Sequence, residues 1–238
     1  GGMPTPDEAS ADLYLLNTCT VTDQADREAG RLLRKSTASL TVATGCLAEV
    51  DPERLAQSGG EEKKVRIVRN SAKQEIKTLV EEWLRGALTE QSEILHGDRA
   101  AWHQSFLQNR DALEISKASA APRTRAFLKV QDGCNAFCSY CVIPLARGRS
   151  RSLDAEQVVQ EIRAAVAGGA QEVMLTANHG DEYDYVALDF TGLVEKALEE
   201  TDVPRLRLTS LDPAEIPDRL IGLMEKNSRL CPHFHVSL

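Results

Sequence analysis

Residues 126–141 read "AFLKVQDGCNAFCSYC", a short apolar run followed at once by three closely spaced cysteines. The run "AFLKV" (126–130) predicts a strand, and the cysteines follow it in a Cys-x3-Cys-x2-Cys spacing. Gly133 precedes the first cysteine and permits the loop to wrap closely around a ligand. Because α/β folds place their sites beyond the carboxyl ends of parallel strands, this stretch predicts a site at such an edge.

The chain downstream of this loop alternates helices with strands. Asp154 and Gln157 resemble a capping box that opens a helix, and Gly168 and Gly169 close it. Further strands are predicted at 172–176, 205–210 and 233–238, with helices at 190–200 and 218–226 between them. Four strands of this kind without a closing partner predict the first part of a (β/α) barrel over residues 123–238.

The chain upstream of the loop shows the same alternation. Apolar runs predict strands at 12–16, 41–45 and 65–68, and helical spacing predicts helices at 23–35, after Asp51-Pro52 and from Ser71 to about residue 85. The fold class is therefore α/β, with an N-terminal parallel-sheet domain of the flavodoxin or Rossmann type over residues 1–90. Residues 91–122 lose this rhythm and are predicted to be a linker.

Composition and charge exclude some classes of protein for this sequence. The 238 residues are 42% hydrophobic, and no run approaches the twenty apolar residues of a membrane span, so we expect a cytoplasmic protein without membrane segments. The net charge of −8 argues against a protein that coats nucleic acid over its whole surface. The segment from Lys117 to Arg151 nevertheless carries seven basic residues against one acid, as a local phosphate-binding patch or a solvated loop would.

The three cysteines of the loop are candidate metal ligands. Cys134, Cys138 and Cys141 fit an iron-sulfur cluster, because thiolates on a short loop can converge on it. Three protein ligands leave one iron of a four-iron cluster open for a substrate or cofactor. A zinc site, or no metal at all, are the alternatives. His179, His233 and His235 are further candidate metal ligands, although a role in hydrogen bonding or in lining the barrel would also explain them.

Two more cysteines follow predicted strands in the N-terminal domain. Cys19 follows "LYLLNT" and Cys46 follows "TVATG", so both lie at the same edge of the predicted sheet. The small residues and the glycine before them would let a bulky inorganic ligand approach. The alternative is that both are small buried hydrophobic residues, as is common for cysteine outside disulfides.

The cysteine loop, with Tyr140 before its third cysteine, resembles that of the radical S-adenosylmethionine (SAM) enzymes. Together with "LLNTCTVTDQAD", "ATGC" and "ARGRSRS", it resembles the methylthiotransferases, which join a cluster domain to a radical SAM barrel. The flanks "QDGC" and "ARGRSRS" are most similar to the branch that acts on threonylcarbamoyladenosine beside the tRNA anticodon. The branch acting on a ribosomal-protein aspartate is one alternative, and a non-catalytic, metal-stabilised tRNA-binding module is another.

This resemblance implies a cofactor set and a reaction. A [4Fe-4S] cluster on Cys134, Cys138 and Cys141 would bind SAM and, with an electron from an external donor, yield a 5′-deoxyadenosyl radical that attacks an adenine carbon. A second [4Fe-4S] cluster would use Cys19, Cys46 and a third cysteine upstream of this chain. The resemblance also implies SAM contacts, which it places at Tyr140, Thr176 and Ser237.

The chain departs from the family pattern in several places. The family has further segments before residue 1 and after residue 238, so we expect the sequence to be incomplete at both ends. The loop "ANHGDEYDY" (177–185) replaces a glycine and adds acids where SAM contacts are expected, and Arg69 stands where a glycine is usual.

Overall fold

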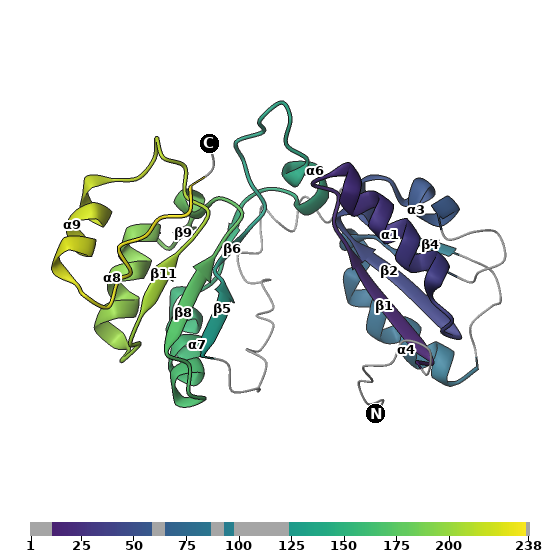
Figure 1. Ribbon diagram of the computed structural model, residues 1–238, viewed down its shortest axis with the longest axis horizontal. Helices are drawn as coiled ribbons and strands as arrows, with labels where there is room; N and C mark the ends of the chain where they lie inside the picture. Colours follow the sequence, from purple (N-terminus) through teal and green to yellow (C-terminus); the bar gives the residue numbers. More distant parts are fainter. Residues whose placement is uncertain (1–10, 59–64, 87–92, 98–123, 237–238) are drawn as a thin grey trace. The chain divides into compact units, whose positions relative to one another are not determined.

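The computed structural model describes residues 11–58, 65–86, 93–97 and 124–236. By its internal contacts the chain divides into two units, each with its own sheet (Figure 1). Unit 1 comprises Gly1–Gln104 with Tyr140–Arg147, and unit 2 comprises Ser105–Ser139 with Gly148–Leu238. No helix among the described residues is long and apolar enough to cross a membrane.

Unit 1 contains a parallel sheet whose strands lie in sequence order. The strands are β1 (Leu13–Thr18), β2 (Leu40–Gly45), β3 (Val65–Val68) and β4 (Glu93–Leu95). Every residue of β2 and β3 is buried, which is the pattern of parallel strands covered on both faces. The predicted parallel α/β sheet is confirmed.

Helices cover both faces of this sheet. They are α1 (Asp23–Lys35), α2 (Cys46–Val50), α3 (Pro52–Ser58), the 3-10 segment η2 (Asn70–Glu75) and α4 (Ile76–Leu84). Leu33 and Leu55 from α1 and α3 pack with Ile67 in one apolar cluster, whereas Leu79 of α4 packs with Val42 in another. Because neighbouring strand residues alternate between the faces, each strand contributes to both clusters.

Three details of unit 1 differ from the sequence prediction. β4 lies within residues 91–122, which were predicted to be linker, and it pairs in parallel with β3. Residues 70–75 form a 3-10 turn where the α-helix was predicted to begin at Ser71. The short helix α2 was not predicted, because five residues are too few to show a helical period.

Unit 2 is built on a second parallel sheet of order β11-β8-β5. These strands are β5 (Arg125–Lys129), β8 (Glu172–Thr176) and β11 (Leu206–Leu208). Three helices accompany them, namely α7 (Ala155–Ala167), α8 (Phe190–Glu200) and α9 (Asp218–Lys226). The Asp154 side chain caps α7 by accepting from the backbone N–H of Glu156 and Gln157, which confirms the predicted helix start.

One face of this sheet is covered and the other is open. Leu128, Val173 and Leu206 pack with the helices in a single buried cluster. Phe127 alternates with Leu128 along β5 and is 57% exposed, because it lies on the opposite face. Parallel strands alternating with helices, one face covered and one open, form the part of a (β/α) barrel that the sequence predicted.

The predicted fourth barrel strand, 233–238, forms one parallel bridge in the part that is described, and a second bridge lies just before it. Leu230 pairs with Leu206, and Val236 pairs with Leu211. The backbone N–H of Cys231 donates to the Leu206 carbonyl at 2.8 Å, and that of Leu211 donates to the His235 carbonyl at 3.2 Å. The segment therefore runs beside β11 without forming a continuous ladder.

Candidate metal centre

The loop that carries Cys134 starts at a glycine whose conformation no other residue easily adopts. After β5 the chain forms a two-residue strand, β6 (Gln131–Asp132), which pairs antiparallel with β7 (Arg151–Ser152). Gly133 has φ +77°, and a Cβ at this position would lie closer than 3.0 Å to the Arg149 carbonyl. The two segments therefore run in contact, and the Cys134 N–H donates to the Gly148 carbonyl at 3.2 Å.

The buried side chain of Gln131 joins this loop to the loop after β8. Its amide nitrogen donates to the Gly133 carbonyl and to the Ser150 hydroxyl, each at 2.8 Å. Its amide oxygen accepts from the backbone N–H groups of Asn178 and His179 at 2.9 and 3.0 Å. One side chain thus uses all four of its hydrogen-bonding positions to fix two loops that are 47 residues apart.

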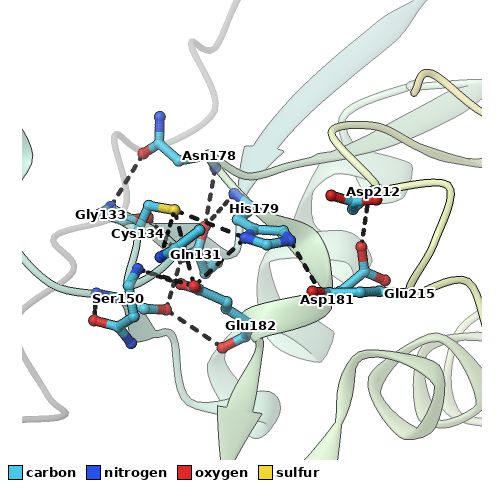
Figure 2. A network of polar contacts seen from close by, with 12 residues as sticks. Gln131, Gly133, Cys134, Ser150, Asn178, His179, Asp181, Glu182, Asp212 and Glu215 are labelled. Carbon is cyan, nitrogen blue, oxygen red and sulfur yellow. Dashed lines mark hydrogen bonds and ion pairs between the residues drawn. The ribbon is translucent and has the colours of Figure 1, made fainter. Parts of the chain in front are cut away.

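Side chains of the loop after β8 also bond to the backbone of the cysteine loop (Figure 2). The Asn178 side-chain oxygen accepts from the Gly133 N–H at 3.1 Å, and the Glu182 carboxylate accepts from the Asn135 N–H at 2.9 and 3.0 Å. Glu182 lies in the 3-10 turn η3 (Gly180–Glu182). We call residues 178–182 the clamp loop, because they hold the start of the cysteine loop. This is the segment that departs from the family pattern.

The cysteines of the loop differ in their surroundings. Cys134 is half-buried, accepts an N–H from Ala136 at 3.4 Å, and has its sulfur 3.7 Å from His179 Nδ1. Cys138 is exposed, and Cys141 is half-buried in the segment 140–147 that groups with unit 1. None of the six cysteines, all of which lie among the described residues, forms a disulfide.

The donor set fits an iron-sulfur cluster. Three thiols that form no disulfide can supply the sulfur ligands. The Ala136 N–H donates to the Cys134 sulfur, and hydrogen bonds of this kind stabilise cluster thiolates. Phe137, between the first two cysteines, has φ +47°, and the Arg149 guanidinium lies 5.2 Å from its ring centroid. Joint binding of a cluster by Cys134, Cys138 and Cys141 stays a prediction.

The three residues expected to contact SAM lie in different parts of the chain. Tyr140 is 90% exposed. Thr176 ends β8, and its carbonyl accepts from the Val130 N–H at 2.9 Å. Ser237 lies outside the described residues. These three contacts also stay predictions.

Three cations of the basic segment around the loop pair with carboxylates. Arg125 pairs with Glu172, and both Lys129 and Arg151 pair with Asp132, at 3.1 and 2.8 Å. Two of the seven basic residues, Lys117 and Arg123, lie outside the described part. Asp132 already belongs to the segment, and Glu172 also pairs with Arg205 and Arg207, so the segment keeps a net positive charge and the phosphate-binding patch stays a prediction.

In unit 1, Cys19 and Cys46 occupy neighbouring strand ends. Thr18 pairs with Gly45 at the end of the β1 and β2 ladder, so the next residue of each strand is a cysteine. Gly45 has φ +103°, and a Cβ there would overlap the Thr18 backbone. Cys19 is exposed and Cys46 is buried. The glycine is thus explained by backbone contact within the sheet, and a cluster on these cysteines stays a prediction.

Two polar contacts of a buried carboxylate in unit 1 were not anticipated. Arg69 has φ −62°, an ordinary value, so the expected glycine is not needed for the backbone. Its guanidinium donates to the Glu49 carbonyl at 2.7 Å and lies 3.4 Å from the Glu49 carboxylate. That fully buried carboxylate also accepts from the Ser71 N–H at 3.1 Å. Arg69 thus compensates a buried charge.

Comparisons with known proteins agree with this architecture. The profile of the radical SAM superfamily matches residues 128–238, and the profile of the uncharacterized protein family UPF0004 matches residues 1–66. A radical SAM methyltransferase, TsrM from Kitasatospora setae, has a similar fold, with a TM-score of 0.56 at 18% identity over 91% of this chain and 48% of that one. Unit 2 therefore contains a radical SAM domain.

Several relatives match both units. The threonylcarbamoyladenosine tRNA methylthiotransferase MtaB of Aquifex aeolicus is 32% identical over 97% of this chain and 54% of its own length. The Bacillus subtilis MtaB is 28% identical over 97% and 50%, and the tRNA-2-methylthio-N(6)-dimethylallyladenosine synthase of Geobacter metallireducens is 32% identical over 99% and 53%. The chain is therefore similar to radical SAM methylthiotransferases over both units. It spans about half the length of these relatives.

Proposed function

We propose that this protein is a tRNA methylthiotransferase that adds a methylthio group to an adenine carbon of N6-threonylcarbamoyladenosine, next to the anticodon. The observation that carries the proposal is the cysteine loop at the carboxyl end of the first strand of unit 2, held by Gln131 and the clamp loop. A rigidly placed loop of this kind is what a cofactor site requires. The similarity to MtaB over both units supports the tRNA substrate.

The residues of the chain have defined tasks in this proposal. Cys134, Cys138 and Cys141 would hold the cluster, which when bound supplies one-electron chemistry to SAM at its open iron. Gln131 and Asn178 position the loop by fixing Gly133 at its start. Tyr140, Thr176 and Ser237 would orient SAM. Cys19 and Cys46 would hold a second cluster with a third ligand upstream, and an external donor would supply electrons.

The proposal is tested by expressing the protein in cells that lack this modification and by mass spectrometry of the tRNA nucleosides. We expect methylthiolated threonylcarbamoyladenosine when the chain is expressed together with the upstream segment that would carry the third cysteine, and none when that protein carries Cys134→Ala. The same mass shift on isopentenyladenosine or on a ribosomal-protein aspartate would overturn the substrate assignment. Zinc in the purified protein, with neither cluster nor SAM cleavage after reconstitution, would favour a non-catalytic tRNA-binding module.

A further inference from the structure

Three ligand atoms of different chemistry meet between the cysteine loop and the clamp loop. The Cys134 sulfur lies 3.7 Å from His179 Nδ1 and 3.8 Å from Glu182 Oε1, and these last two atoms lie 3.4 Å apart. Figure 2 shows the imidazole ring of His179 beside the Cys134 sulfur and the Glu182 carboxylate. All three residues are half-buried.

These three distances match the edges of a zinc tetrahedron. Zinc binds thiolate sulfur at about 2.3 Å and imidazole nitrogen or carboxylate oxygen at about 2.0–2.2 Å. Tetrahedral angles then separate sulfur from nitrogen or oxygen by about 3.6 Å, and nitrogen from oxygen by about 3.4 Å. Each of the three separations between Cys134, His179 and Glu182 lies close to its ideal value, so a single ion can reach all three atoms with little movement.

The surroundings hold the ligands in place. The backbone N–H of His179 is bonded to Gln131, and the Glu182 carboxylate accepts from the Asn135 N–H. Glu215 Oε2 lies 3.2 Å from His179 Nε2, the ring nitrogen that faces away from Cys134. These two atoms lack hydrogen-bond geometry, so the contacts with Gln131 and Asn135 are the ones that hold the ligands in place.

We propose that Cys134, His179 and Glu182 form a site for a single zinc-class divalent cation, with a fourth position open to water. The thiolate favours zinc over magnesium or calcium, which prefer oxygen ligands. A second group, His179 with Asp181 and Glu215, also has its ligand atoms within 4.8 Å of one another. It contains no thiolate, and its Glu215 is exposed. The first group is therefore the site.

Zinc and the iron-sulfur cluster compete for Cys134. This part of the inference rests on the proposed function, because it takes Cys134 to be a cluster ligand. A sulfur held by zinc against His179 and Glu182 is withdrawn from the other two cysteines of the loop. Zinc bound at this site consequently blocks cluster assembly, and the clamp loop sets which metal the protein receives.

The zinc site is tested in a Cys138→Ala, Cys141→Ala double variant, which lacks two cluster ligands but keeps all three zinc ligands. We expect this variant to bind one zinc per chain in an anaerobic titration against a chelator. With Co²⁺ it should show a sulfur-to-cobalt charge-transfer band. Adding His179→Ala or Glu182→Gln should weaken zinc binding more than about tenfold. Adding His233→Ala, which changes an exposed histidine of unit 2, should leave it unchanged.

Two results would overturn the zinc site. One is a double variant that binds no zinc, and the other is zinc binding that neither His179→Ala nor Glu182→Gln weakens. Circular dichroism checks that each variant is folded. Should His179→Ala unfold, Glu182→Gln decides, since its amide oxygen still accepts from the Asn135 N–H while an amide is a poor zinc ligand.

Competition is measured separately in the chain with all its cysteines. Zinc added before iron and sulfide should lower the iron loaded per chain, and His179→Ala should restore it. Equal iron loading with and without zinc would contradict the competition. A chain that binds zinc as predicted but assembles no cluster under any condition would refute the proposed function and leave the zinc site standing.

Discussion

Gly133 sets the path of the cysteine loop, because its φ of +77° and its contact with the Arg149 carbonyl leave no room for a side chain. We predict that Gly133→Ala destabilises unit 2 by about 1–3 kcal/mol and lowers iron loading. Gly222→Ala is the matched control, since Gly222 lies within α9 with nothing near its Cβ position. It should raise stability by about 0.5–1 kcal/mol. Equal effects of the two substitutions in urea denaturation would contradict this account.

Gln131 depends on being an amide rather than an acid. We predict that Gln131→Glu costs at least about 1–3 kcal/mol and reduces cluster assembly, because the Gly133 carbonyl and the Ser150 hydroxyl lose a donor and a buried charge appears. The measurements are the urea midpoint and the iron content after reconstitution. Gln171→Glu, at an exposed position, should change neither. A Gln131→Glu chain that loads iron like its parent would show that the amide does not position the loop.

For individual residues, the sequence predicts which side chains could bind a metal better than it predicts which residues they contact. The cysteine spacing predicts Cys134, Cys138 and Cys141 as cluster ligands, and "QDGC" marks the start of their loop. The hydrogen bonds from Gln131 to the backbone of Asn178 and His179 could not be predicted, because they span 47 and 48 residues of sequence. Glu182 reads as one of several added surface acids, although it holds the Asn135 N–H. Such roles depend on contacts between segments that are distant in the sequence, and the spacing of residues along the chain does not reveal these contacts.

Among the elements, β8 begins at a carboxylate that joins all three strands of unit 2. Glu172 is buried and pairs with Arg125 of β5, with Arg205 just before β11 and with Arg207 within it. Its hydrogen bond with Arg207, and then that with Arg205, hold the pKa of Glu172 below its ordinary value despite burial. A lowered carboxyl pKa stabilises the fold above the unfolded pKa of about 4.3, and this contribution is lost as pH falls through the folded pKa.

We therefore predict that Glu172→Gln destabilises the protein at pH 7 by about 1–3 kcal/mol and by less below pH 4. The melting temperature measured from pH 7 to pH 3 checks this, with the parent falling more steeply at the acid end. Glu199→Gln, at an exposed position of α8, is the control and should follow the parent curve. Parallel curves for the parent and Glu172→Gln would contradict the role of this carboxylate.

The sequence predicts the helices and strands that are long enough to show an apolar period. The helices α1 and α7 and the strands β2, β3, β5 and β8 were all anticipated, since each has a clear apolar period or a capping residue. The three-residue strand β4 is too short to show a period, and pairing with β3 decides its conformation. The predicted strand at 233–238 forms one bridge, from Val236 to Leu211, in its described part.

For the whole molecule, the division into two α/β units agrees with matches to two different family profiles. The partners of charged residues are not visible in the sequence. The basic segment from Lys117 to Arg151 suggested a phosphate-binding patch, and three of its cations pair with the two carboxylates of Asp132 and Glu172, so the patch stays a prediction. The partners that cancel a charge are set by the fold, so a count along the chain cannot reveal them.

The most direct test of the account is the amount of iron bound per chain. The parent and a Cys134→Ala, Cys138→Ala, Cys141→Ala triple variant are reconstituted anaerobically with iron and sulfide, and iron is counted in each. The account predicts that the folded triple variant binds about four irons fewer than the parent. Equal iron content in the two proteins would contradict it.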